Sequence, residues 1–140
     1  MIGHGGGTLA RSLNKILPSS QITIVEIDKD IFNISKKYFS FKENKNLKTI
    51  VTDGRVFVKK AKRKGYKYDW VILDAFTSNY VPAHMMTFEF LTEVRGILSE
   101  RGLVTSNTLR LGRLYDHESV TYKKVFKSIY SFDDPESIAR

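Results

Sequence analysis

The sequence has 140 residues and a formal net charge of +8, and 41% of its residues are hydrophobic, which is typical of one soluble globular domain with a packed core. It contains no cysteine, which excludes disulfides, zinc–thiolate sites and a cysteine nucleophile and is typical of a cytoplasmic protein. No apolar run approaches the roughly 18 residues of a membrane span, so we expect residues 1–140 to form one domain that does not enter a membrane.

The first part of the chain alternates between strand-like and helix-like apolar patterns. Residues 1–2 are predicted to end a first strand, and residues 8–17 to form a helix that stops at Pro18. Residues 22–27 are rich in β-branched side chains and predict a second strand, after which Asp28 is placed to cap a helix that turns its apolar side inward. The apolar faces predicted for the two helices consist of Leu9, Leu13, Ile16 and Leu17 and of Ile31, Ile34 and Tyr38.

Residues 47–51 are predicted to form a third strand and residues 55–63 a short helix. Basic side chains gather around the end of this helix, at Lys59, Lys60, Lys62, Arg63, Lys64 and Lys67. Such a cluster can meet a nucleic acid or an acidic lipid surface. Cations at the end of a helix also complement its dipole, and no aromatic residue interleaves with them to stack on bases. We therefore expect a solvated helix face and no nucleic-acid partner.

Residues 70–73 are predicted to form a buried fourth strand and residues 87–98 a helix with Leu91, Val94 and Leu98 toward the core. Gly102 is predicted to lie in a turn before a fifth strand over residues 103–107. A last helix is predicted over residues 118–130. Alternating strands and helices are typical of an α/β fold, with a mainly parallel sheet and helices on both faces. A doubly wound sheet usually has a full first strand and further strands after the fifth. We therefore expect this domain to be truncated at both ends.

Gly3, Gly5 and Gly7 lie between the first strand and the first helix. Glycines there let the backbone turn tightly and approach a ligand, and the free N–H groups of a helix start favour an electronegative group. By itself the pattern is weak evidence for a ligand site, because a glycine-rich N-terminal tail has the same composition. A nicotinamide-binding fingerprint would place its third glycine where this chain has Thr8, so the pattern leans away from NAD.

Three carboxylates follow three consecutive strands, at Glu26, Asp53 and Asp74. The carboxyl ends of parallel strands share one edge, where ligands of open α/β sheets bind, so we interpret the three as one site. Each has an ordinary alternative. Glu26 can be an exposed strand-end residue or a partner of Lys29, and Asp53 with Gly54 can be a simple turn. Asp74 can cap the loop that follows it.

In this order, the blocks resemble the spermidine-synthase-like family. The blocks that carry the resemblance are residues 2–8, 25–28, 53–54, 73–76 and 81–91. The resemblance implies a methyltransferase-like Rossmann fold and a co-substrate that is S-adenosylmethionine or its decarboxylated form. It implies that the nucleoside is held by Gly3, Gly5 and Gly7 at the methionine-derived tail, by Glu26 at the ribose, and by Asp53 and Gly54 at the adenine. It also implies that Asp74 is the catalytic acid/base residue, since an amine that attacks next to a sulfonium must lose a proton.

Two positions depart from the family pattern. Gly6 and Thr77 stand where authentic spermidine synthases have aspartates, and both changes remove negative charge from the place of the polyamine. The β-domain that precedes this region in those enzymes is also absent from the sequence. The resemblance therefore implies a transferase that moves an aminopropyl or related group to a small amine acceptor. A methyltransferase and a non-catalytic nucleoside-binding or assembly module stay open as alternatives.

No metal is expected. His4, His84 and His117 do not have the spacing of metal ligands, and we expect them at the surface or in loops. An exposed sheet edge would be compatible with a homodimer.

Overall fold

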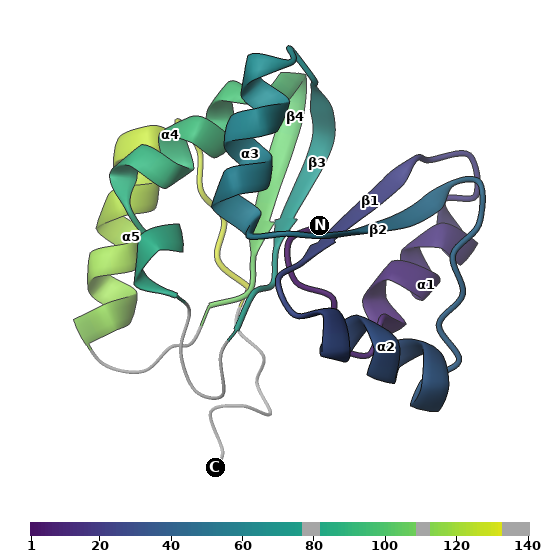
Figure 1. Ribbon diagram of the computed structural model, residues 1–140. Helices are drawn as coiled ribbons and strands as arrows, with labels where there is room; N and C mark the ends of the chain where they lie inside the picture. The colour runs from purple at the N-terminus through teal and green to yellow at the C-terminus, as the bar shows by residue number, and fades with distance from the viewer. Residues whose placement is uncertain (77–81, 109–112, 133–140) are drawn as a thin grey trace.

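The computed structural model of the protein describes residues 1–76, 82–108 and 113–132. Within these ranges helices and strands alternate along the chain (Figure 1). The strands are β1 (Ile22–Glu26), β2 (Leu47–Val51), β3 (Tyr68–Leu73) and β4 (Leu98–Ser106). The α-helices are α1 (Thr8–Ile16), α2 (Lys29–Tyr38), α3 (Gly54–Arg63), α4 (Phe88–Gly96) and α5 (Arg113–Val125), and a 3-10 turn, η1, covers Ala83–Met85. None of the helices in this part of the chain has the length and apolar character needed to cross a membrane.

The strands are parallel, and Ile2 joins them into one layer. β1 pairs with β2 and β3 pairs with β4, while Ile2 bridges to Val25 on one side and to Leu73 on the other. The backbone N–H of Ile2 donates to Ile72 O at 2.8 Å, and that of Gly3 donates to Val25 O at 2.9 Å. The prediction that the chain opens with the tail of a strand is therefore confirmed, and the loop after Ile2 leaves the sheet between the ends of β1 and β3.

Helices cover both faces of the sheet, as predicted, because alternate residues of a strand point to opposite sides (Figure 1). Ile24 of β1 packs with Ala10 of α1 in one buried cluster, which also contains Phe41 and Leu47. Its neighbour Val25 belongs to the other cluster, which is built largely from α3, α4 and β3 with residues such as Val58, Phe90, Leu91 and Val94. The fold class is thus α/β with a parallel sheet between two helical layers.

The faces predicted for α1 and α2 are largely wrong. Ile16 is 71% exposed and Tyr38 is 68% exposed, and Leu9, Leu17, Ile31 and Ile34 are exposed as well. α1 approaches the sheet through the small, fully buried Ala10, and α2 approaches through Ser35, which is also fully buried. Small side chains allow a close approach, so the apolar pattern does not mark the inner side of either helix. The cap predicted at Asp28 is confirmed, since its Oδ1 accepts from Asp30 N at 2.7 Å.

The second half of the chain departs from prediction at β4 and α5. β4 begins at Leu98, where the helix was expected to continue, and Gly102 lies inside the strand. Tyr68 pairs with Leu98 but Trp70 pairs with Leu103, so β4 carries extra residues in a bulge. A Cβ on Gly102 would lie 2.9 Å from Tyr68 O, which explains the glycine.

Two smaller corrections concern exposure and helix ends. Trp70 is 39% exposed, although its strand was predicted to be buried. α5 covers Arg113–Val125, earlier than the predicted 118–130, and Ile129 beyond it is 43% exposed. The basic cluster around the end of α3 is exposed throughout, which confirms the solvated helix face.

Candidate functional site

The glycine loop is built from backbone conformations that favour glycine. Gly3, Gly5 and Gly7 have φ angles of 99°, 51° and 74°, all in the left-handed region. A Cβ on Gly3 would lie 2.1 Å from the backbone oxygen of Asp74, so the loop packs directly against the end of β3. Gly7 is the N-cap of α1 and offers no side-chain acceptor to the first N–H groups of the helix. The loop therefore packs on the end of β3 at Gly3 and leaves the first N–H groups of α1 without a side-chain cap at Gly7.

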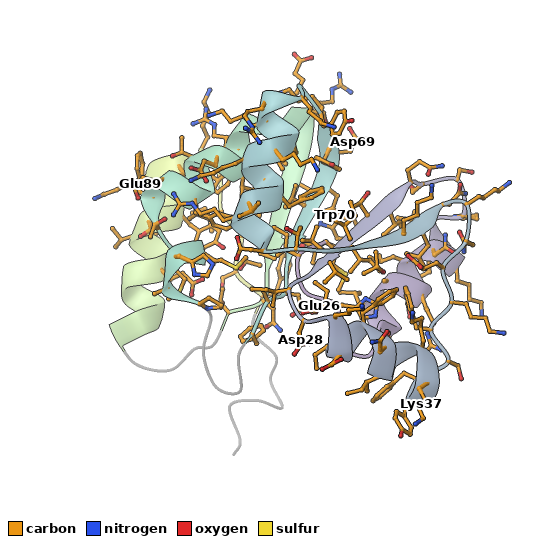
Figure 2. The ribbon with its side chains drawn as sticks, in the orientation of Figure 1. Glu26, Asp28, Lys37, Asp69, Trp70 and Glu89 are labelled. Atoms are coloured by element: carbon orange, nitrogen blue, oxygen red, sulfur yellow. The ribbon has the colours of Figure 1, made fainter. Side chains whose placement is uncertain are left out.

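Glu26 is 9% exposed and lies at the end of β1, where the strand meets the glycine loop (Figure 2). Its Oε2 accepts from the backbone N–H of His4 at 3.0 Å, and its Oε1 accepts from that of Asp28 at 3.0 Å. These bonds tie the end of β1 to the glycine loop. Glu26 is neither an exposed strand-end residue nor a recorded partner of Lys29 within the described residues. Each carboxylate oxygen keeps a lone pair for a further donor.

His4 lies in this loop, in keeping with the expectation of a surface or loop position, but it is buried. It is 4% exposed and contacts the rings of Phe32 and Phe41 edge-on. The Ser35 hydroxyl has one hydrogen, which it donates to Phe32 O. His4 must therefore be the donor in the second contact, from Nε2–H to Ser35 Oγ, 2.6 Å away. Its Nδ1 is buried without a hydrogen-bond partner among the described residues. Burial lowers the pKa of His4, against the opposing charges of Glu26 and Glu43.

Asp53 begins α3 as its N-cap. Its Oδ1 accepts from Val56 N at 2.9 Å, and its Oδ2 lies 3.3 Å from Nε2 of the half-exposed His84. Gly54 is buried, and a Cβ there would lie 2.6 Å from Ile2 Cγ2. The Asp53–Gly54 pair thus has a structural role, in addition to the adenine contact that stays a prediction.

Asp74 is held by a residue that the sequence analysis did not single out. Asn107, which follows β4, donates from Nδ2 to Asp74 Oδ1 at 3.0 Å, and its backbone N–H donates to Leu73 O at 2.9 Å. Asn107 stands after its strand as Asp74 stands after β3, so the strand-end rule that selected Asp74 would also have selected it. Thr77 lies outside the described residues, and so do the side chain of His117 and the loop that Asp74 was expected to cap.

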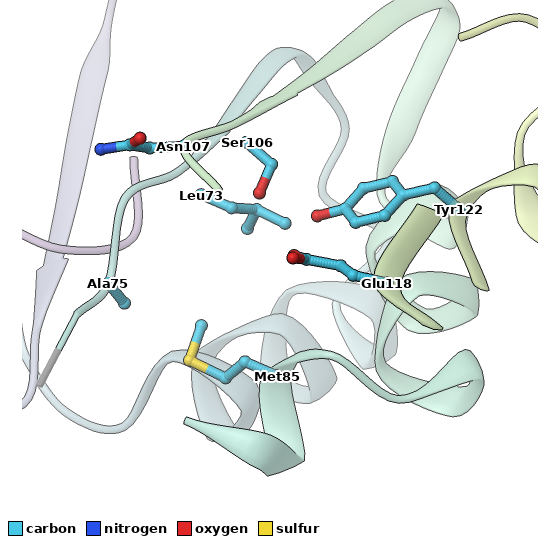
Figure 3. A pocket seen from close by; sticks show the side chains of 7 residues that line it. All are labelled: Leu73, Ala75, Met85, Ser106, Asn107, Glu118 and Tyr122. Atoms are coloured by element: carbon cyan, nitrogen blue, oxygen red, sulfur yellow. The ribbon is translucent and has the colours of Figure 1, made fainter. Parts of the chain in front are cut away.

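A cavity lies at the ends of β3 and β4, and the residues on both sides of Asp74 line it (Figure 3). Its lining residues are Leu73, Ala75, Met85, Ser106, Asn107, Glu118 and Tyr122. Burial raises the pKa of the Glu118 carboxyl. Burial also raises the pKa of Tyr122 to about 12, against a hydrogen bond with Ser106 that lowers it. The polar residues of this cavity were not predicted.

Two of the three strand-end acids lie against the glycine loop, and the third follows the neighbouring strand. Glu26 and Asp74 both contact the glycine loop, and β2, which leads to Asp53, lies beside β1, with Thr52 N donating to Glu26 O at 2.8 Å. Across the described ranges, no group of three or more histidine, aspartate or glutamate side chains has the arrangement of a metal site.

A parallel sheet with this loop and edge defines the class of methyltransferase-like Rossmann folds. Two solved structures share it. One is human Methyltransferase-like protein 13 in complex with SAH, with a TM-score of 0.84 and 25% identity over 92% of this chain and 62% of that one. The other is a probable spermidine synthase from Corynebacterium glutamicum, with a TM-score of 0.78 and 25% identity over 90% of this chain and 45% of that one.

Within that class, the chain belongs to the spermine/spermidine synthase domain family, whose model matches residues 1–133. It is 43% identical to a polyamine aminopropyltransferase of Vibrio vulnificus over 136 residues, which cover 97% of this chain and 46% of that protein. The resemblance inferred from the sequence is thus confirmed. The chain spans about half the length of this relative.

Proposed function

We propose that this chain binds a nucleoside of the S-adenosylmethionine type and transfers an aminopropyl group from decarboxylated S-adenosylmethionine to a small amine. The observation that carries the proposal is the position of Asp74. Its backbone touches Gly3 of the loop that would hold the nucleoside, and its carboxylate is oriented by Asn107, which also lines a cavity. Family membership supports the same activity.

In this proposal, the nucleoside lies along the glycine loop. Gly3, Gly5 and Gly7 line its methionine-derived tail, and the free N–H groups at the start of α1 face it. Glu26, already fixed by two backbone donors, accepts the ribose hydroxyls with its remaining lone pairs. Asp53 and Gly54 lie at the adenine.

Asp74 serves as the base. The nitrogen lone pair of the amine attacks the carbon of the aminopropyl group next to the sulfonium, and the carbon–sulfur bond breaks with its electrons going to sulfur. The products are an N-alkylated amine and methylthioadenosine, and the proton lost by nitrogen goes to the Asp74 carboxylate. Most of the acceleration comes from holding nitrogen and carbon in line, since the sulfonium leaves readily.

A methyltransferase is the second candidate, because a methyltransferase-like protein matches this fold over most of the chain. Calorimetric titration with S-adenosylmethionine, its decarboxylated form and methylthioadenosine separates the candidates. Tighter binding of the decarboxylated form supports aminopropyl transfer, and tighter binding of S-adenosylmethionine favours methyl transfer. Absence of binding would contradict both and leave the non-catalytic assembly module.

A cytoplasmic location and a homodimer are further parts of the proposal. β2 and β4 form the outer edges of the sheet in the described residues, and unpaired edges favour strand pairing between copies. Sedimentation of the purified protein tests the dimer.

A further inference from the structure

The cavity beside Asp74 contains a buried carboxylate that the proposed chemistry has not used. Glu118 projects from α5 and is 6% exposed. Figure 3 shows its oxygens directed into the cavity toward the hydroxyls of Ser106 and Tyr122. No lysine, arginine or histidine forms an ion pair with Glu118 in the parts of the chain that the structure describes.

Burial of this carboxylate lowers the stability of the fold. A carboxylate removed from water without a cation loses solvation that two hydroxyl groups only partly replace. Leu73 and Met85 form the apolar side of the same cavity, and burial raises the pKa of Glu118. A leucine there would pack without this cost, so a purely structural role does not account for a glutamate. A buried carboxylate that opens into a cavity is suited to a cationic ligand.

Asn107 connects this carboxylate to the proposed catalytic base. Its side chain donates to Asp74 and also lines the cavity that contains Glu118. Asn107 is thus a neighbour of both carboxylates, and Figure 3 shows its amide directed away from the Glu118 oxygens. The cavity has space for a group about the size of a water molecule, which is also the size of an ammonium group.

We propose that Glu118 binds the non-reacting ammonium group of a diamine acceptor whose other amine lies at Asp74. This inference rests on the proposed function and assigns its amine subsite to α5. An ammonium has three N–H donors, which match the Glu118 carboxylate and the hydroxyl oxygens of Tyr122 and Ser106. Gly6 and Thr77 offer no carboxylate, so the negative charge for the acceptor comes from a different element.

The test compares Glu118→Gln with Glu100→Gln in the full-length protein. Glu100 is an exposed carboxylate at the other end of β4, so its loss changes the net charge equally without touching the cavity. Calorimetry with saturating methylthioadenosine measures the affinity for putrescine and for n-butylamine, which lacks the second ammonium. Glu118→Gln should weaken putrescine binding by about 30-fold or more and leave butylamine unchanged. Glu100→Gln should change neither by more than about two-fold.

A second measurement separates binding from folding. Removing a buried charge without a partner should raise the Tm of Glu118→Gln above wild type when no amine is present, while the increase in Tm caused by putrescine disappears. If methylthioadenosine binds and Glu118→Gln keeps the wild-type affinity for putrescine, Glu118 is not the subsite, and the proposed function stands without it. If the wild type binds no nucleoside, the proposed function fails and this inference fails with it.

Discussion

Asn107 Nδ2 donates a hydrogen bond of 3.0 Å to Asp74 Oδ1, and this bond fixes one oxygen of the proposed base at the end of β3. The other oxygen has no recorded partner among the described residues. Removing the base should therefore cost more activity than removing the residue that orients it.

Asp74→Asn should lower kcat by about a hundred- to ten-thousand-fold, since the amide cannot take the proton of the attacking amine. Affinity for methylthioadenosine should stay close to wild type, because the contact with Gly3 is made by the backbone. Steady-state kinetics with several amine acceptors and calorimetry measure the two quantities. Full activity of this variant with any acceptor would exclude Asp74 as the base.

Asn107→Ala should lower kcat by about ten-fold, less than Asp74→Asn, because it removes the group that orients the base but leaves the base in place. The double variant should be no slower than Asp74→Asn alone, since a positioning residue has no effect once the group it positions is lost. Losses that multiply in the double variant would show that Asn107 acts on the reaction independently of Asp74.

Glu26→Gln should weaken nucleoside binding by about ten- to a hundred-fold, because the ribose loses a charge-assisted acceptor. It should also lower the Tm. The NH2 group of glutamine cannot accept a hydrogen bond, so the backbone N–H of either His4 or Asp28 loses its acceptor. Asp30→Asn, which neutralises an exposed carboxylate in the first turn of α2, is the matched control. An unchanged titration curve for Glu26→Gln would remove Glu26 from the nucleoside site.

Gly3→Ala and Gly5→Ala should differ sharply in stability. Both positions have a positive φ, which costs an alanine about 1 kcal/mol. Only Gly3 has a neighbour in the way, since its Cβ would lie 2.1 Å from Asp74 O, whereas nothing lies within 4 Å at Gly5. Gly3→Ala should therefore lower the free energy of unfolding by more than about 3 kcal/mol in urea denaturation. Equal losses would contradict the packing of the loop on β3.

The free energy of unfolding should fall as the pH drops below 6.5, in part because of His4. Burial holds the pKa of His4 below its ordinary value of 6.5, so the unfolded chain takes up the proton first and gains stability relative to the fold. The contribution is fully present above pH 6.5 and is lost as the pH falls toward the folded-state pKa. His4→Gln should show a shallower decline in urea denaturation across this range. An identical decline in both proteins would exclude His4 as the source.

The alternation of elements, the glycine loop and the strand-end positions of Glu26, Asp53 and Asp74 could be predicted from the residues alone, and with them the family. These features are local. Strand and helix periods are set by neighbouring residues, and parallel strands bring their carboxyl ends to one edge whatever packs around them.

Only the tertiary structure decided which side of a helix is inside and what surrounds a polar group. Judged by residue type, Ser35 and Glu118 should be exposed and Ile34 and Tyr38 buried. The structure shows the reverse. Ser35 is buried because it meets His4, which is far away in sequence, and Glu118 because α5 packs on α4 and faces a cavity at the ends of β3 and β4. Burial depends on the sum of contacts from distant segments, and a residue's own character contributes only one part of that sum.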